Sequence, residues 1–217
     1  MHEFGLYIRR RGAPGYHPAF ILYCSCYGYN TFMSKTFTGR GDDGTTGTLG
    51  PNRIRKDDIQ PETYGTVDEL SAALAVARAY CKDPAVVEVV IEIQRDLFNM
   101  MSELAAAPDL QEKFRKIDAA RVSWLEESVR QIEQIVDFPS NFIISGDTPA
   151  AAHFDLARTI ARRAERRVVA LYYTDAISNP EILRYLNRLS SLLFLCVLLE
   201  TTRDGRPLTF ANRTSGP

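Results

Sequence analysis

Hydrophobic positions recur with helical spacing through most of the chain after residue 61, and strand-like alternation is scarce. Five segments carry the pattern, and they are joined by short connections. The pattern predicts an all-α protein, a five-helix up-and-down bundle, preceded by a loop rich in glycine and threonine over residues 36–61. The predicted helices span residues 62–80, 84–107, 117–136, 149–173 and 180–202.

Local signals support the helix boundaries. The segments 147–149 (DTP) and 178–181 (SNPE) each place a capping residue before a proline, which is typical of a helix start. Phe138-Pro139 ends the third helix. The apolar faces predicted for the first three helices consist of Leu70, Leu74 and Ala77; Val87, Ile91, Leu97 and Met101; and Trp124, Leu125, Ile132 and Ile135.

The two ends of the chain differ in character from the helical region. Residues 1–33 mix aromatic residues, glycine, proline and an arginine run without a period, and we interpret them as a disordered leader or a misassigned start. Glu3 and the scarcity of serine argue against a transit peptide. The functional domain is predicted over residues 34–203, followed by a flexible tail over 204–217.

Composition excludes several classes of function. The chain has 217 residues and a net charge of −1, which suits one soluble domain and offers no broad basic surface for nucleic acid or acidic membranes. The longest apolar run, 192–199, is too short to span a membrane. The cysteines lack zinc-site spacing and the histidines form no HExxH motif, so no dedicated metal site is predicted. A reducing cytoplasm fits best.

The segment 39–46 (GRGDDGTT) is the first candidate for chemistry. It matches GxGxxG without the strand-to-helix context of a dinucleotide fold, and it lacks the lysine of a Walker A loop. Glycines nevertheless let backbone amides approach an anion, and threonine hydroxyls donate further hydrogen bonds. Arg53, Arg55 and Lys56 follow and supply positive charge. A flexible surface loop explains the same composition.

The fourth helix carries the second candidate, residues 157–167 (ARTIARRAERR). One face is shared by Arg158, Arg162, Glu165 and Arg166, and Arg163 and Arg167 lie one position around from it. Arginine dominates there without its usual glutamate partners. Guanidinium groups grip phosphate oxygens in pairs, so the face favours a polyphosphate site. An exposed basic stripe or an intersubunit salt-bridge face is the structural alternative.

The fifth helix adds Arg184, Arg188 and Ser191 on one face, with Asn187 beside it. A buried asparagine in a leucine-rich helix needs a hydrogen-bond partner, so Asn187 indicates either a ligand contact or a structural bridge between helices. The Glu126-Glu127 pair of the third helix is interpreted as a solvated surface.

Taken together, the segments resemble one family. Residues 37–46 (FTGRGDDGTT), 56–58 (KDD) and 64–70 (YGTVDEL) are similar to the amino-terminal signature of PduO-type ATP:cob(I)alamin adenosyltransferases. Residues 157–167 and 185–190 (YLNRLS) resemble the family's arginine helix and final helix motif. The order and separations agree, and the resemblance covers about residues 36–200.

The resemblance implies a homotrimeric helical bundle that transfers the 5′-deoxyadenosyl group of ATP to cob(I)alamin or a related corrinoid, with active sites between subunits. It implies that Mg²⁺ accompanies the triphosphate. ATP would be held from one chain by Thr38, Gly39, Arg40, Gly41, Thr46, Gly47 and Lys56. The next chain would add Arg162, Arg163, Ala164, Glu165, Arg166 and Asn187, with Arg162, Arg166 and Asn187 closest to the chemistry.

The resemblance further implies an intersubunit pair, Asp68 with Arg158, and a corrinoid side that includes Phe142, Arg188 and Ser191. A flavin-dependent reductase and an adenosylcobalamin-dependent enzyme would be partners. Two positions depart from the family: Ser191 stands where Asp is usual, and Gly146-Asp147 where Gly-Gly is usual. An impaired ATP- and cobalamin-binding carrier, and a purely structural bundle, are therefore the alternatives.

Overall fold

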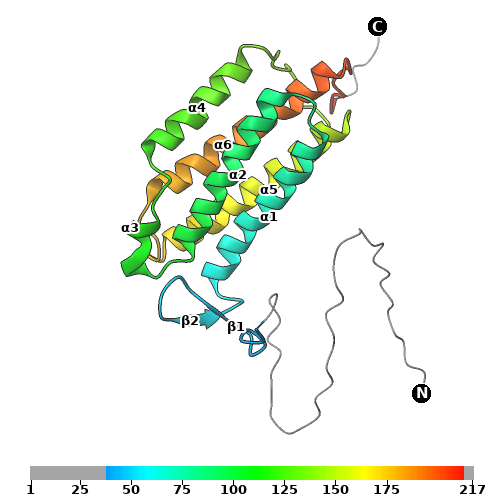
Figure 1. Ribbon diagram of the computed structural model, residues 1–217. Helices are drawn as coiled ribbons and strands as arrows, with labels where there is room; N and C mark the ends of the chain where they lie inside the picture. Colours follow the sequence, from blue (N-terminus) through cyan, green and yellow to red (C-terminus); the bar gives the residue numbers. More distant parts are fainter. Residues whose placement is uncertain (1–37, 213–217) are drawn as a thin grey trace, which may run out of the picture. The chain divides into compact units, whose positions relative to one another are not determined.

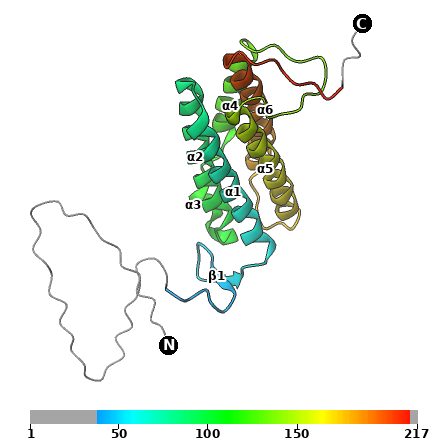
Figure 2. The same cartoon turned by 90° about the vertical axis from the view of Figure 1, so that its right-hand side faces the viewer.

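The computed structural model describes residues 38–212, and residues from Gly39 onward form one compact unit. Five long helices make up this unit: α1 (Ile59–Tyr80), α2 (Pro84–Leu104), α4 (Ala119–Glu133), α5 (Pro149–Tyr172) and α6 (Pro180–Arg203). They run alongside one another as a bundle (Figures 1 and 2). The predicted all-α, five-helix architecture is confirmed, and the leader prediction for residues 1–33 lies outside the described residues.

Shorter elements complete the fold. A 3-10 turn, η1 (Pro108–Leu110), and one helical turn, α3 (Gln111–Phe114), connect α2 to α4. Two short strands, β1 (Thr45–Gly47) and β2 (Arg53–Arg55), pair antiparallel ahead of α1. The sequence predicted only a loop there, because three-residue strands are too short for an alternating pattern to show.

The helix α6 packs against both α4 and α5, while α1 packs against α5 and α2. Its apolar side chains are almost all buried, from Ile182 to Leu199. By length and composition α6 is able to cross a membrane, which the sequence analysis did not anticipate. However, 67% of its most apolar stretch is buried inside the protein, as expected for the core helix of a soluble bundle.

The predicted helix starts are confirmed at two caps. The Thr148 hydroxyl accepts the backbone N–H of Ala151 at 3.1 Å, and the Asn179 side chain accepts that of Glu181 at 3.0 Å. Proline follows each capping residue. These contacts satisfy backbone donors that a helix start leaves without partners.

The predicted buried faces are right for α1 but partly wrong for α2 and α4. Leu70, Leu74 and Ala77 are fully buried. In α2 the buried set is Val86, Val90, Ile93, Leu97 and Met100, so the predicted Val87, Ile91 and Met101 lie beside the buried face. The α2 segment is apolar on adjoining faces, which leaves the phase of the pattern ambiguous. Ile135 lies beyond the end of α4 and is 57% exposed.

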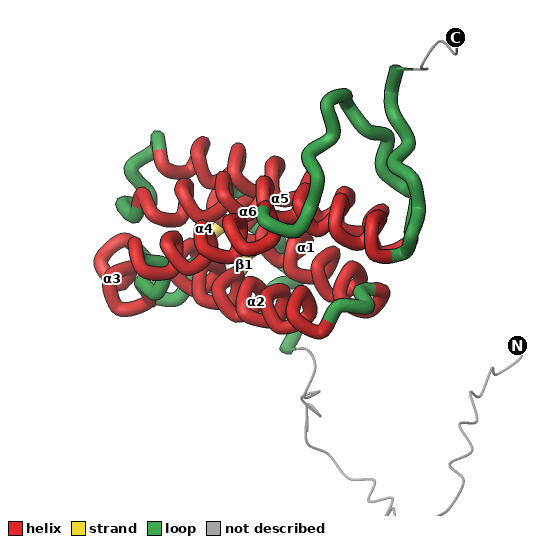
Figure 3. Tube along the Cα trace, turned by 90° about the horizontal axis from the view of Figure 1, so that it is seen from above, coloured by secondary structure: helices red, strands yellow, loops and turns green. Residues whose placement is uncertain are grey.

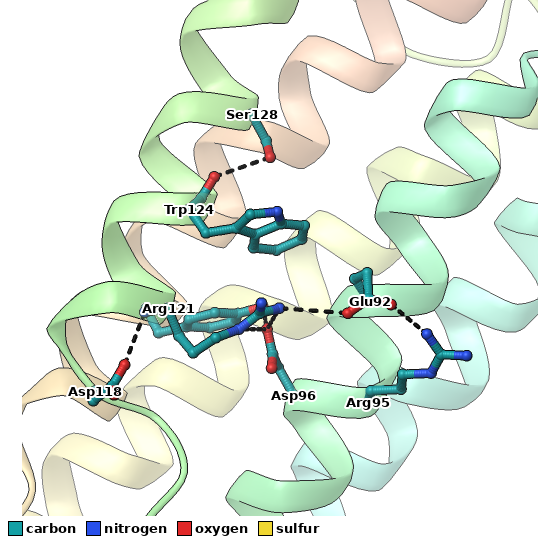
Figure 4. A network of polar contacts seen from close by, with 8 residues as sticks. Glu92, Arg95, Asp96, Asp118, Arg121, Trp124 and Ser128 are labelled. Carbon is teal, nitrogen blue, oxygen red and sulfur yellow. Dashed lines mark hydrogen bonds and ion pairs between the residues drawn. The ribbon is translucent and has the colours of Figure 1, made fainter.

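A buried polar network crosses the bundle between α2, α4 and α6. Asp96 of α2 is 5% exposed and accepts hydrogen bonds from Arg121 at 2.5 Å and from the Tyr185 hydroxyl at 2.7 Å. The Arg121 guanidinium also lies over the Trp124 ring, 4.2 Å from its centroid (Figure 4). Because a buried carboxylate without partners is costly, this network fixes how α4 sits on α2.

The segment after α6 is tied to the bundle over the residues that the structure describes. Ile144 donates its backbone N–H to Thr209, and Ala211 donates to Phe142. The sequence predicted a flexible tail over 204–217, of which residues 213–217 lie outside the described part.

Candidate nucleotide and corrinoid site

The glycine-rich loop and the strand pair form a small folded unit. Gly39 and Gly44 have φ values of 72° and 79°, which favour glycine at these turns. Arg53 holds the loop closed, since its guanidinium donates to the backbone oxygen of Arg40 at 2.6 Å and to the Thr45 hydroxyl at 2.7 Å. Thr46 and Gly47 lie on β1, opposite Ile54 and Arg53. The loop is therefore a shaped turn rather than an unstructured segment.

The three cationic residues that follow the loop differ in whether their side chains already have a partner. Arg53 is used for the loop itself, and Arg55 pairs with Asp57 at 2.6 Å. Lys56 is exposed, and within the described residues it forms no hydrogen bond or ion pair through its side chain. Its Nζ lies over Gly41, 3.0 Å from where a Cβ would stand. Lys56 is thus a free cation beside a glycine backbone, which suits an incoming anion.

The loop is fastened to the end of α2. Leu49 donates its N–H to Ala105 at 2.8 Å and accepts from Ala107 at 3.1 Å, and the Gln60 amide donates to Leu104. Gly50 allows this approach, because a Cβ there would lie 2.9 Å from the Ala107 Cβ. The position of Lys56 is therefore set by the bundle.

The arginines of α5 divide into two groups. Arg163 pairs with Glu69, and Arg167 with Glu62 at 3.2 Å, so these two hold α1 against α5. The expectation that the arginines lack glutamate partners is wrong. Arg162 pairs with Glu165 of the same helix, and the partners of Arg163 and Arg167 come from α1. Arg162 and Arg166 lie on the α6 side and are exposed.

A chain of contacts joins Arg162 to α6. Arg162 donates to Glu165 at 2.8 Å, and the other carboxylate oxygen of Glu165 accepts from the Asn187 amide at 3.0 Å. Arg166 donates to the backbone oxygen of Arg162 at 3.0 Å. Ala164, which lies between Arg162 and Arg166 in the sequence, is fully buried and lets α5 pack closely against its neighbouring helices. Arg162, Arg166 and Asn187 are thereby held together on one surface.

Arg188 is oriented by a residue that the sequence analysis placed in solvent. Its Nε donates to Glu126 of α4 at 3.1 Å, and its Nη1 donates to the Asn187 side chain, also at 3.1 Å. Glu126 is therefore an interhelical partner, and only Glu127 makes the surface pair, with Arg130. A carboxylate still fixes Arg188 although position 191 is serine.

A cavity of about 1040 Å³ lies between the 138–145 segment, α5 and α6. Its apolar lining comes from aromatic and aliphatic residues, and Phe142 is 88% exposed at this surface. Arg158 and Arg162 of α5 and Ser191 of α6 also line it, whereas Arg188 does not. The full apolar set is Phe138, Pro139, Phe142, Ile143, Phe194 and Leu195.

The predicted pair of Asp68 and Arg158 does not form within one chain. Arg158 donates to Asp155 at 2.7 Å, while Asp68 is exposed and has no ion-pair partner among the described residues. Nor does any hydrogen bond or ion pair join Lys56 to Arg162 or Asn187. Among residues 38–212, no group of three or more histidine, cysteine or acidic side chains is placed to hold a metal ion.

Residues 36–200 match the family model described as cobalamin adenosyltransferase. The chain therefore belongs to the cobalamin adenosyltransferase family, and the resemblance inferred from its motifs is confirmed. It is 37% identical over 175 residues to the corrinoid adenosyltransferase of Bacillus subtilis, covering 79% of this chain and 89% of that protein. It is 33% identical over 187 residues to corrinoid adenosyltransferase MMAB of Bos taurus, covering 81% and 75%.

Solved structures narrow the similarity to the PduO type. A variant PduO-type ATP:corrinoid adenosyltransferase from Lactobacillus reuteri, complexed with cobalamin and ATP, superimposes with a TM-score of 0.76 at 30% identity. The match covers 84% of this chain and 98% of that one. Another variant of the Lactobacillus reuteri enzyme, complexed with ATP, gives a TM-score of 0.75 at 29% identity.

Proposed function

We propose that this protein transfers the 5′-deoxyadenosyl group of ATP to the cobalt of a reduced corrinoid, with release of triphosphate and formation of adenosylcobalamin. The observation that carries the proposal is the place of Arg162. It lines the 1040 Å³ cavity and is also linked through Glu165 to Asn187. A cation that faces both a polar helix surface and an aromatic cavity suits a reaction between a polyphosphate and a large apolar macrocycle.

The reaction needs no nucleophile from the protein. The electron pair of cob(I)alamin forms a bond to the 5′ carbon of ATP, the bond from that carbon to oxygen breaks, and its electron pair leaves with the triphosphate. The protein has to align the two substrates and stabilise the charge on the leaving group. Lys56, Arg162 and Arg166 have the charge for the second task, and Mg²⁺ bound to the phosphates would share it.

The active site is completed between subunits of a homotrimer in this proposal. One chain would supply Thr38 to Gly41, Thr46, Gly47 and Lys56, and its neighbour would supply Arg162 to Arg166 and Asn187. Two findings support this division. Among residues 38–212 of one chain, Lys56 has no anionic partner, and no hydrogen bond joins it to Asn187.

A turnover assay tests the proposal. The protein is incubated anaerobically with ATP, Mg²⁺ and chemically reduced cob(I)alamin, and the absorption spectrum of the alkylated corrinoid is followed. If adenosylcobalamin forms only when both the protein and ATP are present, the result supports the proposed enzymatic activity. Binding of both substrates without turnover would instead support a protein that carries ATP and cobalamin without catalysing the transfer. Ser191, which lines the cavity, is the reason to test this alternative.

The reduced corrinoid and the product both require other proteins in this proposal. A flavin-dependent reductase would supply cob(I)alamin, and an adenosylcobalamin-dependent enzyme would receive the product. The free thiols of Cys81 and Cys196 are consistent with a reducing cytoplasm. Burial, followed by the neighbouring Glu200, raises the pKa of Cys81 to about 12, so this thiol is an unreactive structural group.

Replacing Lys56 with alanine should weaken ATP binding by about tenfold to a hundredfold, because one charge-assisted contact to phosphate is worth about 1.5–3 kcal/mol. The melting temperature should stay within about 1 °C of the parent, since Lys56 makes no ion pair in the described structure. Isothermal titration with MgATP gives the affinity. Lys116→Ala is the matched control, because Lys116 is exposed and also without an ion pair among the described residues. Parental affinity in Lys56→Ala would remove Lys56 from the nucleotide site.

Charge reversal at Asp68 should weaken the trimer if Asp68 meets Arg158 of a neighbouring chain. We expect Asp68→Arg to lower the trimer fraction and turnover, and the added Arg158→Asp change to recover part of both, because the pair is then restored with its charges exchanged. Sedimentation velocity measures assembly. Asp109→Arg is the control, since Asp109 is also exposed and unpaired in the described part. If the double variant loses as much trimer and turnover as the two single variants together, Asp68 and Arg158 do not form a pair.

A further inference from the structure

The chain returns to the cavity after α6 ends. Gly205, with a φ of 66°, lies in the turn that reverses the backbone, and residues 206–212 then run beside the 142–147 segment (Figure 3). Ile144 donates its N–H to Thr209 at 2.7 Å, and Ala211 donates to Phe142 at 2.8 Å. Ile143 and Phe210 form an antiparallel bridge between these hydrogen bonds. We call residues 205–212 the C-terminal strap.

One side-chain contact closes the strap. Asp147 accepts two hydrogen bonds from Thr209, from the hydroxyl to Oδ1 at 2.6 Å and from the backbone N–H to Oδ2 at 3.1 Å. Asp147 directly precedes the Thr148 cap of α5. The contact therefore joins the strap to the rigid start of a core helix, and hydrogen bonds to a charged acceptor are the stronger kind.

The strap supplies hydrogen bonds to one wall of the cavity, residues 142–147. Among the hydrogen bonds of residues 38–212, the ones made with Thr209 and with Ala211 are the only ones that tie residues 142–147 to another segment. This wall carries Phe142, Ile143 and Ser145, and the strap residue Asn212 lines the same cavity. Ile143 is half-buried and packs against the hydrophobic core, but Phe142 is 88% exposed, so its own packing does not fix its position.

We propose that Asp147 and Thr209 are positioning residues for the corrinoid, an inference that rests on the proposed function. They fix the backbone of Phe142 at the distance from α5 and α6 that a bulky macrocycle needs. The nucleotide side does not depend on them, because Lys56 and Asn187 are held by contacts with α2 and α5 instead. The contact between Asp147 and Thr209 therefore sets corrinoid affinity separately from ATP affinity.

Substitutions in the full-length protein test this separation. Thr209→Val removes the hydroxyl donor while keeping the size of the side chain, and Ala211→Pro removes the backbone donor to Phe142. For each variant we expect the Kd for cob(II)alamin and the KM for cob(I)alamin to rise about fivefold, the effect of losing one hydrogen bond. The KM for ATP should not change. Thr209→Ser retains the hydroxyl and should restore parental values.

Amide hydrogen exchange in the absence of corrinoid provides an independent measurement. Exchange at Ile144 and its neighbours should be faster in Thr209→Val, because the wall opens more often. Thr202→Val is the matched control, since the Thr202 hydroxyl donates to the backbone oxygen of Leu198 within α6.

The outcomes separate the two proposals. If the parent binds cob(II)alamin and Thr209→Val and Ala211→Pro bind it equally well, the positioning role is wrong while the proposed function stands. An equal loss of ATP and corrinoid affinity also overturns it, because that result indicates general destabilisation. If the parent itself neither binds nor alkylates the corrinoid, the proposed function is wrong and the assignment of the strap to corrinoid binding is wrong with it.

Discussion

Replacing Arg162 with alanine is expected to lower kcat/KM for adenosyl transfer by about a hundredfold or more. Arg162 is the residue that lines the cavity and connects through Glu165 to Asn187, so its guanidinium is placed where the leaving triphosphate gathers charge. Removing one preorganised donor to developing negative charge costs about 2.7–4 kcal/mol in other enzymes. Steady-state kinetics with saturating cob(I)alamin and varied ATP give both kcat and KM.

The fold of this variant should be preserved. Arg162 is exposed, and its pair with Glu165 lies one turn apart on the same helix, a contact worth only about 0.3–0.5 kcal/mol. Arg130→Ala removes a comparable arginine, paired with Glu127 on the outer face of α4, and should leave turnover unchanged. A kcat within twofold of the parent in Arg162→Ala would exclude this residue from stabilising the leaving group.

Those parts of the fold that depend on near neighbours in the sequence were predictable. The caps at Thr148 and Asn179 bond to a backbone N–H two or three residues on, so the residues that cause the helix to begin stand together in the chain. The same holds for the turn glycines of the 39–46 loop. The motifs there also indicated the family, which the matching family model confirms.

Contacts between distant segments were not predictable in this way. Arg163 finds Glu69 and Arg188 finds Glu126 only after the helices pack, and nothing in the spacing along one helix indicates a partner on another. The strap is a similar case. Its polar composition is typical of a free end, yet Thr209 meets Asp147 because α6 ends beside the start of α5.

The phase of α2 shows a third limit. Periodicity finds a helical face, but the bundle selects among neighbouring apolar positions, and here it buries Val86 and Val90 rather than Val87 and Ile91. Asp96 could not be recognised as a core residue for the same reason. It looks like a surface acid in the sequence and becomes buried only because Arg121 and Tyr185 surround it.

Replacing Asp96 with alanine should destabilise the protein by about 3 kcal/mol, the lower end of the cost of breaking a buried ion pair. Asp96 Oδ2 accepts from both Arg121 and the Tyr185 hydroxyl, and its side chain is 6% exposed. Burial, and then the charge of Asp96, raises the pKa of Tyr185 well above its ordinary value, so this hydroxyl stays a donor. Arg121 retains a weaker contact with Glu92 at 3.8 Å, which limits the loss.

The melting temperature of Asp96→Ala should fall by roughly 10 °C, since each kcal/mol shifts a domain of this size by about 2–4 °C. Glu127→Ala, which removes an exposed carboxylate, is the control and should shift it by less than about 2 °C.

If Asp96→Ala does not fold, Tyr185→Phe still tests the network, because it removes only the hydroxyl and should cost about 1–2 kcal/mol. Affinity for ATP in the folded protein should remain at the parental value for both variants, since the network lies between α2, α4 and α6 and does not line the cavity. Urea denaturation, followed by circular dichroism, gives the free energies. Parental stability in both variants would mean that water replaces these partners at little cost, and that packing alone holds α4 on the bundle.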